Sequence, residues 1–361
     1  MPKLLIADDS ALMRKFLGEI FRIEGDFELA FARNGLEALA MAHSFAPDVI
    51  TLDVNMPEMD GITCLSRIMV ECPKPVVMVS SLTSQGAEVT LQALSLGAID
   101  FIAKPDGTVS LHIDKIRGAL VSRVRNAAST RIRASRNLLE RLRHGAEAGG
   151  TSTARASRGT VARVGTGASG PVRGVVLIGV STGGPSAIET ILPRLAEDFP
   201  WPIVVAQHMP ESFTGVFARR IDSLCQIRVV EVSRATPLAA GMAYVGRGDA
   251  DIVLTTRAGA LHAVPMPASA RHVWHPSVER LVTSAMDQVP VQNLLGVMLT
   301  GMGDDGAEAM TDLRARGGRT IAEAEETAVV WGMPGELVRR GGANLVLPLH
   351  RIADQMARWT N

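Results

Sequence analysis

Residues 48–61 read DVITLDVNMPEMDG, an apolar run that ends in Asp53 and is followed by a turn-forming stretch. Similar runs lie on either side of it, and helix-like segments separate them. This alternation is typical of a parallel sheet with helices on both faces, so we predict a five-stranded, doubly wound, flavodoxin-like α/β domain. The other runs are KLLIAD at 3–8, FELAFA at 27–32, PVVMVS at 75–80 and DFIAKP at 100–105.

The chain continues well beyond this unit, because 361 residues exceed what one ordinary core needs. Residues 123–172 are rich in Arg, Ala, Ser, Gly and Thr and lose the apolar periodicity, which indicates a linker. We therefore predict a first domain at 1–122 and a second α/β domain, with a mainly parallel sheet, at 173–361. The strands expected in the second domain are GVVLIGV at 174–180, WPIVVAQH at 201–208, MAYVGRG at 242–248, NLLGVMLTG at 293–301 and RTIAEAE at 319–325.

The composition narrows the class of protein. Basic and acidic residues balance at 37 each, so the whole chain offers no electrostatic reason to bind nucleic acid. Eleven arginines gather between 123 and 173, but without aromatic residues, so a solvated spacer is favoured over a nucleic-acid-binding output module. The three cysteines lack metal-type spacing and indicate reduced thiols. With no signal peptide or membrane-spanning run, we predict a cytoplasmic protein without membrane insertion.

Carboxylates follow two strands of the first domain. Asp8 and Asp9 close the first strand and Asp53 closes the third, so all three should meet at the carboxyl edge of the sheet. Like charges repel there unless a hard cation such as Mg²⁺ joins them, and Asp53 could then accept a phosphoryl group. Ser80 and Lys104, at the ends of the fourth and fifth strands, could bind that group. The alternative is that each aspartate only caps a helix.

A serine, a histidine and an aspartate follow strands of the second domain. Ser181 lies in GVSTGGP at 179–185, on a predicted sharp turn between a strand and a helix. His208 follows the next strand, where Nε2 could take the serine proton, and Asp305 could orient the imidazole. The histidine pair His272 and His275 lacks a third ligand, so we do not expect a metal there.

The loop LTGMGDDGAEAM at 299–310 also allows a different interpretation. Gly301, Gly303 and Gly306 form a GxGxxG pattern, with Glu323 and Glu325 downstream, as in dinucleotide-binding oxidoreductases. The paired carboxylates of Asp304 and Asp305 oppose it, because they would face a pyrophosphate. An esterase, in contrast, needs an acid in this loop and backbone N–H groups that bind an oxyanion.

Both domains resemble known families. Residues 1 to about 120, with the paired acids, Asp53, Ser80 and Lys104, resemble the receiver domain of two-component response regulators. Residues 174–361 resemble the CheB family of chemotaxis methylesterases through GVSTGGP, AQHMPESFTGVFARRI, LTGMGDDGAEAM and EETAVVWGMP. The family has a Pro-Gly turn and a later His where this chain reads YVGRGDAD at 244–251, and Asp where this chain has Glu279.

The resemblance implies roles and partners. Ser181 would be the nucleophile, His208 the base and Asp305 the acid, and Thr182 and Met302 match active-site positions. The implied activities are removal of methyl groups from glutamate esters of methyl-accepting chemotaxis receptors and deamidation of receptor glutamines. The receiver would use Mg²⁺ and a chemotaxis histidine kinase as phosphodonor, and would restrain the esterase until it is phosphorylated; the ester step would need no cofactor. The alternative is a methylesterase-like regulator of another signalling pathway.

Overall fold

A computed structural model describes residues 1–360 except residue 82, residues 105–112 and residues 131–171. The chain divides into two compact units, with the boundary between residues 165 and 166. Most of the predicted linker lies outside the described residues. The last helix of the first unit ends at Ser129, seven residues past the predicted domain end at 122.

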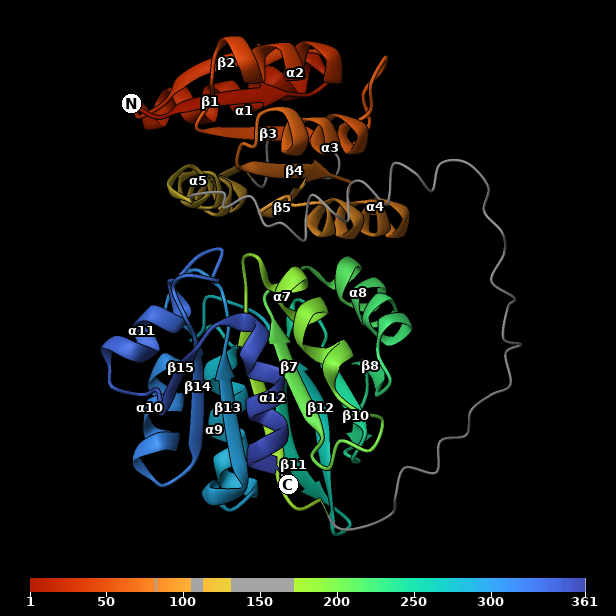
Figure 1. Ribbon diagram of the computed structural model, residues 1–361, viewed down its shortest axis with the longest axis vertical. Helices are drawn as coiled ribbons and strands as arrows, with labels where there is room; N and C mark the ends of the chain where they lie inside the picture. Colours follow the sequence, from red (N-terminus) through yellow and green to blue (C-terminus); the bar gives the residue numbers. More distant parts are fainter. Residues whose placement is uncertain (82, 105–112, 131–171, 361) are drawn as a thin grey trace, which may run out of the picture. The chain divides into compact units, whose positions relative to one another are not determined.

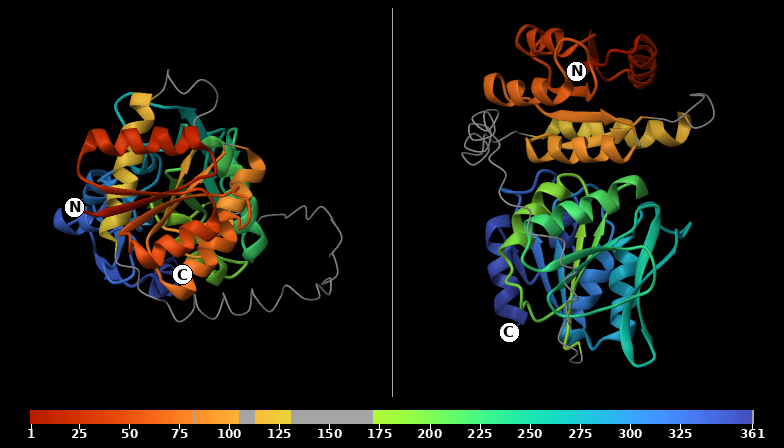
Figure 2. Two further views of the ribbon diagram at one scale, coloured as in Figure 1. Left: turned by 90° about the horizontal axis from the view of Figure 1, so that it is seen from above. Right: turned by 90° about the vertical axis from the view of Figure 1, so that its right-hand side faces the viewer.

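The first unit has a five-stranded parallel sheet in the order β2-β1-β3-β4-β5 (Figure 1). Helices α1 and α5 pack against each other, as do α2 with α3 and α3 with α4, so the sheet is covered on both faces (Figure 2). The prediction of a doubly wound parallel sheet is thus confirmed. The elements are β1 (Lys3–Ala7), α1 (Ala11–Glu24), β2 (Glu28–Ala32), α2 (Gly35–Ser44), β3 (Val49–Asp53), α3 (Gly61–Glu71), β4 (Val76–Ser80), α4 (Ser84–Ser95), β5 (Asp100–Ala103) and α5 (Ile113–Ser129).

The local sequence explains where these elements begin. The strands β3 and β4 are buried along their whole length, as expected of central parallel strands. The helices α1, α2 and α3 begin after Ser10, Asn34 and Asp60, whose side chains accept a hydrogen bond from a backbone N–H of the first turn. Because these caps lie in the loops that follow the strands, polar residues gather at the carboxyl edge of the sheet.

The second unit has a seven-stranded parallel sheet in the order β15-β14-β13-β6-β7-β10-β8. All five predicted strands are present in it, and the edge strands β8 and β15 are additional. The strand order reverses between β6 and β13, which makes their carboxyl ends the expected place for a site. The strands are β6 (Val175–Val180), β7 (Ile203–Gln207), β8 (Arg228–Val232), β10 (Met242–Gly246), β13 (Leu294–Met298), β14 (Arg319–Glu323) and β15 (Leu345–Leu347).

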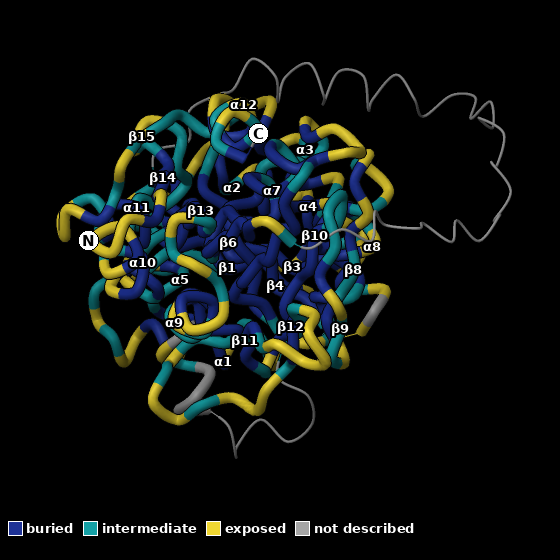
Figure 3. Tube along the Cα trace, turned by 90° about the horizontal axis from the view of Figure 1, so that it is seen from below, coloured by how far each residue is buried: buried dark blue, intermediate teal, exposed yellow. Residues whose placement is uncertain are grey.

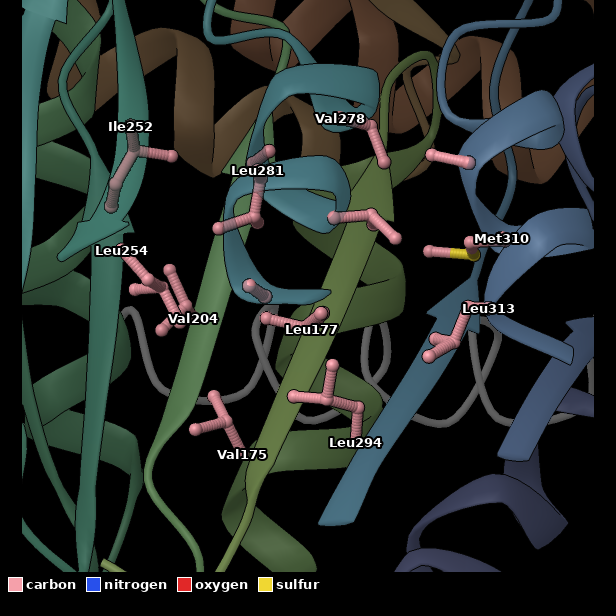
Figure 4. Packing of buried hydrophobic residues seen from close by; sticks show 14 of the residues in the cluster. Val175, Leu177, Val204, Ile252, Leu254, Val278, Leu281, Leu294, Met310 and Leu313 are labelled. Carbon is pink, nitrogen blue, oxygen red and sulfur yellow. The ribbon is translucent and has the colours of Figure 1, made fainter. Parts of the chain in front are cut away.

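Helices cover both faces of this sheet. In one set of helices, α7 contacts both α8 and α12. In the other set, α10 contacts both α9 and α11. Val278 and Leu281 of α9 and Met310 and Leu313 of α10 point towards the sheet in Figure 4. The helices are α7 (Gly184–Ile191), α8 (Glu211–Leu224), α9 (Val278–Gln288), α10 (Ala307–Ala315), α11 (Met333–Arg339) and α12 (Leu349–Thr360).

A small antiparallel sheet extends this second core, and the sequence did not predict it. β11 (Ala250–Arg257) and β12 (Ala260–Pro267) form a hairpin, which pairs with the short strand β9 (Thr236–Pro237). Ile252 and Leu254 of the hairpin join the core beside α9. Figure 3 shows the central strands of both sheets as buried, with exposed residues mainly on loops and outer helix turns. None of the described helices is both long and apolar enough to cross a membrane.

Candidate functional site

The three predicted carboxylates of the first unit lie together. Asp8 and Asp9 follow β1 and Asp53 ends β3, and one carboxylate oxygen of each lies within 4.8 Å of the other two. Lys104, directly after β5, places Nζ 3.0 Å from Asp8 Oδ2 and 2.9 Å from Asp53 Oδ2. Burial raises the pKa of Asp53 to about 6, although its hydrogen bond to Lys104 works in the opposite direction. These hard oxygen ligands suit a divalent cation such as Mg²⁺.

Ser80 lies at the same edge of the sheet, at the end of β4, and is buried. Its hydroxyl donates to the backbone oxygen of Gly86 in α4, at 3.2 Å. The structure therefore brings Asp8, Asp9, Asp53 and Lys104 into direct proximity, whereas the hydroxyl of Ser80 is engaged with α4.

Three loops meet at the switch point of the second sheet, and they follow the neighbouring strands β7, β6 and β13. The N–H of Ser181 donates to the backbone oxygen of Thr300 at 3.0 Å, which joins the β6 loop to the β13 loop. The amide of Gln207 donates to the backbone oxygens of Ser181, at 3.0 Å, and His208, at 3.2 Å. This network holds the loops of Ser181, His208 and Asp305 together.

Glycine is required at two close approaches around Ser181, one in its own turn and one in the loop after β13. Gly183 has φ 76°, a left-handed conformation, and a Cβ there would lie 2.6 Å from Val329 Cβ. A Cβ on Gly301 would lie 2.8 Å from Ser181 Cβ, so the β13 loop passes directly beside the serine. Pro185 then lies in the first turn of α7. The predicted sharp turn between strand and helix is present.

His208 and Asp305 form a buried pair, with 2.8 Å between Nε2 and Oδ2. The carboxylate of Asp305 also lies at the N-terminus of α9, where it accepts from Val278 N at 2.7 Å, Glu279 N at 3.1 Å and Ser277 Oγ at 3.0 Å. Burial by itself would raise the pKa of Asp305, but His208 and the two backbone N–H groups outweigh it and hold the pKa below its ordinary value. Asp305 therefore stays a carboxylate.

The histidine nitrogen that faces the acid differs from the one predicted. Because Nε2 is bonded to Asp305, Nδ1 is the ring nitrogen that remains for a proton from a serine. Within the described part of the chain, the buried Nδ1 has no hydrogen-bond partner. The prediction that Nε2 faces the serine was wrong. The two ring nitrogens point to opposite sides of the imidazole, and the loop after β13 places Asp305 on the Nε2 side.

Thr182 and Met302, the other predicted residues, lie on the loops that flank Ser181. The backbone oxygen of Thr182 accepts from Thr300 Oγ1 at 2.9 Å. Met302 follows Gly301, which lies close to Ser181. Glu279, in the first turn of α9, uses Oε2 to accept from Ala309 N at 3.1 Å, and burial raises its pKa. Glu279 thus joins α9 to α10.

Several residues of this site were not predicted. Trp274 stacks on His208 with 5.5 Å between ring centroids and 12° between ring planes. Asp251 is buried and bonds His275 Nδ1 at 2.8 Å, so His275 helps to anchor the loop that leads into α9. A tryptophan two residues before PSVERL was a visible signal, but nothing in the sequence placed it against His208.

Glu323 also acquires a role that the sequence did not reveal. It is fully buried, and it accepts from Thr300 N at 2.8 Å and from Thr327 Oγ1 at 3.0 Å. Burial raises its pKa to about 7. A residue enclosed in this way cannot bind the ribose of a dinucleotide, so of the two downstream acids only the exposed Glu325 remains for the alternative interpretation of the GxGxxG pattern.

The first unit has a receiver-type fold, and the second is an α/β domain with serine, histidine and aspartate on adjacent strand ends. These two features define a response regulator with a hydrolase-type effector domain. The CheB methylesterase family matches residues 176–356, and the response regulator receiver domain matches residues 4–114. The chain therefore belongs to the CheB methylesterase family.

Full-length relatives agree with this membership. Protein-glutamate methylesterase/protein-glutamine glutaminase 3 of Rhodospirillum rubrum is 57% identical, over 99% of this chain and 96% of the relative. Protein-glutamate methylesterase/protein-glutamine glutaminase 2 of Rhodopseudomonas palustris is 56% identical, over 100% of this chain and 99% of the relative. The crystal structure of the Thermotoga maritima CheB methylesterase catalytic domain is similar with a TM-score of 0.50 and 34% identity, covering 51% of this chain and 97% of that chain.

Proposed function

We propose that this chain hydrolyses glutamate γ-methyl esters of chemotaxis receptors, deamidates receptor glutamines at the same site, and is regulated by phosphorylation of Asp53. The observation that carries the proposal is the buried pair of His208 and Asp305, 2.8 Å apart, on loops joined to the turn of Ser181. Asp305 fixes the proton on Nε2, so Nδ1 is an acceptor.

The reaction follows from these roles. Ser181 rotates towards His208 Nδ1 and loses its proton as Oγ attacks the γ-carbonyl carbon of the ester. Asp305 stabilises the imidazolium that forms, and backbone N–H groups at the N-terminus of α7 and at Met302 would bind the developing oxyanion. His208 returns the proton to the leaving methoxide, which departs as methanol. Water then attacks the acyl-enzyme with His208 again as base, which restores Ser181 and releases glutamate.

The first unit supplies the switch. Asp8, Asp9 and Asp53 would hold Mg²⁺, which neutralises carboxylate and phosphoryl charge when it is bound. Asp53 accepts the phosphoryl group from a chemotaxis histidine kinase, and Lys104 pairs with the added charge. Ser80 would reach that group after its hydroxyl leaves the backbone of Gly86. We place this switch, and the enzyme, in the cytoplasm.

Methanol release from a methylated receptor tests the proposal. Ser181→Ala should abolish release, because the variant lacks the hydroxyl that forms the acyl-enzyme. Ser223→Ala is the matched control, since this exposed serine of α8 donates to the backbone oxygen of Arg220 and lies on a different element. Acetyl phosphate with Mg²⁺ should raise the rate of the wild-type chain. Retained methanol release by Ser181→Ala would refute the assignment of the nucleophile.

A further inference from the structure

The indole of Trp274 covers one face of the His208 ring. The two rings are nearly parallel, at 12°, with 5.5 Å between their centroids. Trp274 belongs to the loop between β12 and α9, and it is partly exposed, whereas His208 is buried. The indole Nε1 also lies on the β13 loop, 3.6 Å from the position of a Cβ on Gly303. Trp274 is therefore held between the histidine and the loop of Asp305.

A buried acid anchors the loop that carries Trp274. Asp251 in β11 accepts from Ser269 N at 3.1 Å near the start of the loop, and from His275 Nδ1 and Ser277 N at its end, both at 2.8 Å. Arg280 of α9 adds an ion pair at 2.5 Å. The side chain of Asp251 is 0% exposed, so these bonds are protected from water. The loop is thus fixed at both ends, and Trp274 is presented rigidly.

Stacking of this kind acts differently on the two charge states of an imidazole. The face of an indole carries negative charge density and attracts a cation that lies over it. As the proposed base, His208 becomes an imidazolium when it takes the serine proton. An interaction that strengthens as the transition state forms raises the rate of the chemical step, whereas one that is equal in both states does not.

We propose that Trp274 is a positioning residue for the hydrolysis: its indole fixes the plane of His208 and stabilises the imidazolium that the reaction creates. The proposal rests on the proposed function, because it assigns His208 the role of base. Asp305 holds one edge of the imidazole and Trp274 holds one face. Together they leave Nδ1 directed to the side from which Ser181 must approach.

The charged side chains near His208 are held by partners other than Trp274. Asp305 is bonded to His208 Nε2, and Glu279 accepts from the N–H of Ala309 in the first turn of α10. Asp304 pairs with Arg340 at 3.8 Å. Substitution at 274 therefore tests the aromatic ring and leaves the ionised groups in place.

The test compares Trp274→Phe, which keeps an aromatic face, with Trp274→Leu, which keeps only an apolar cover, in the full chain. We expect Trp274→Leu to lower kcat for methanol release by about tenfold with KM changed less than about twofold, since an aromatic face matters mainly when the ring is charged. Trp274→Phe should restore most of kcat. If Trp274→Leu fails to fold, Trp274→Met replaces it, because methionine adapts to irregular gaps.

A spectroscopic measurement detects the stacking itself, without activity. In the chain labelled with ¹³C in its histidine rings, the ring protons of His208 should be shifted upfield by the indole, and His208→Gln assigns them by their loss. Trp274→Leu should move these signals downfield and Trp274→Phe should keep part of the shift. Unchanged signals in Trp274→Leu would overturn the contact, and a wild-type kcat with moved signals would overturn its role in catalysis.

These variants distinguish a failure of the proposed function from a failure of the inference on Trp274. If Ser181→Ala and His208→Gln both keep their turnover, His208 is not the base, and the proposed function and the role of Trp274 fail together while the ring signals still report the contact. If those variants are inactive and Trp274→Leu is as fast as the wild type, the proposed function stands and only the inference on Trp274 is refuted.

Discussion

Replacing Asp305 by asparagine removes one negative charge and changes the shape of the side chain very little. The carboxylate accepts four hydrogen bonds, two at each oxygen. An amide has one oxygen and one NH₂ group, so an NH₂ group must face two donors in either orientation. If it replaces Oδ1, it meets the N–H of Glu279. If it replaces Oδ2, it donates to His208 Nε2 and moves the imidazole proton to Nδ1.

Both orientations have a measurable consequence. A buried donor without an acceptor lowers the free energy of unfolding by about 1–3 kcal/mol. The loss of a negative charge at the N-terminus of α9 lowers it by about 0.3–1 kcal/mol more. A proton on Nδ1 blocks the nitrogen that must accept from Ser181. We therefore expect kcat to fall by about 10⁴-fold, the scale seen when a triad aspartate becomes asparagine.

Two measurements on the full chain check this prediction. Methanol release gives kcat, and tryptophan emission during urea unfolding gives stability. All four tryptophans lie in the second unit, so their emission reports on that unit alone. Asp304→Asn is the matched control, because the adjacent side chain is 70% exposed and pairs only loosely with Arg340. If Asp305→Asn keeps kcat within about tenfold of the wild type, or if Asp304→Asn is equally slow, the assignment of the acid is wrong.

Three further predictions concern buried or switch residues. The pKa of Glu323 is raised from 4.5 to about 7, so its stabilising contribution is complete below pH 4.5 and is lost as the pH rises through about 7. Urea unfolding gives the free energy of unfolding of the wild type and of Glu323→Gln. Between about pH 5 and pH 8 the wild type should lose about 2–3 kcal/mol relative to the variant. A difference between the two proteins that does not change with pH would contradict this. Asp53→Asn should keep basal methanol release but lose the stimulation by acetyl phosphate. In the wild type, a coupling free energy of about 1–3 kcal/mol corresponds to a stimulation of about 5- to 150-fold. Stimulation that persists in the variant would exclude Asp53 as the phosphoryl acceptor. Gln207→Leu should lower kcat by about tenfold or more, because the backbone oxygens of Ser181 and His208 lose a shared donor; wild-type kcat in this variant would show that the two loops are held in other ways.

Much of the fold could be predicted from local patterns. The apolar runs that lead to Asp8, Asp53 and Ser181 are largely buried strands in the structure, and short apolar runs between turn signals indicate such strands directly. The hairpin of β11 and β12 escaped prediction because its turn uses Ala258, with φ 48°, and Gly259, with φ 79°, in place of the usual Asn-Gly. The edge strands β8 and β15 are short and partly exposed, so their apolar pattern is weak.

The sequence by itself determined which groups stand at the strand ends: Ser181, His208 and Asp305 in one unit, and the carboxylates around Asp53 in the other. Connections in parallel sheets bring successive strand ends to the same edge, so order along the chain was sufficient for this. Only the tertiary structure decided that His208 turns Nε2 to the acid, that Trp274 stacks on its ring, and that Glu323 is enclosed beside Thr300. Side-chain orientation depends on contacts between residues far apart in the chain, and no local pattern records them.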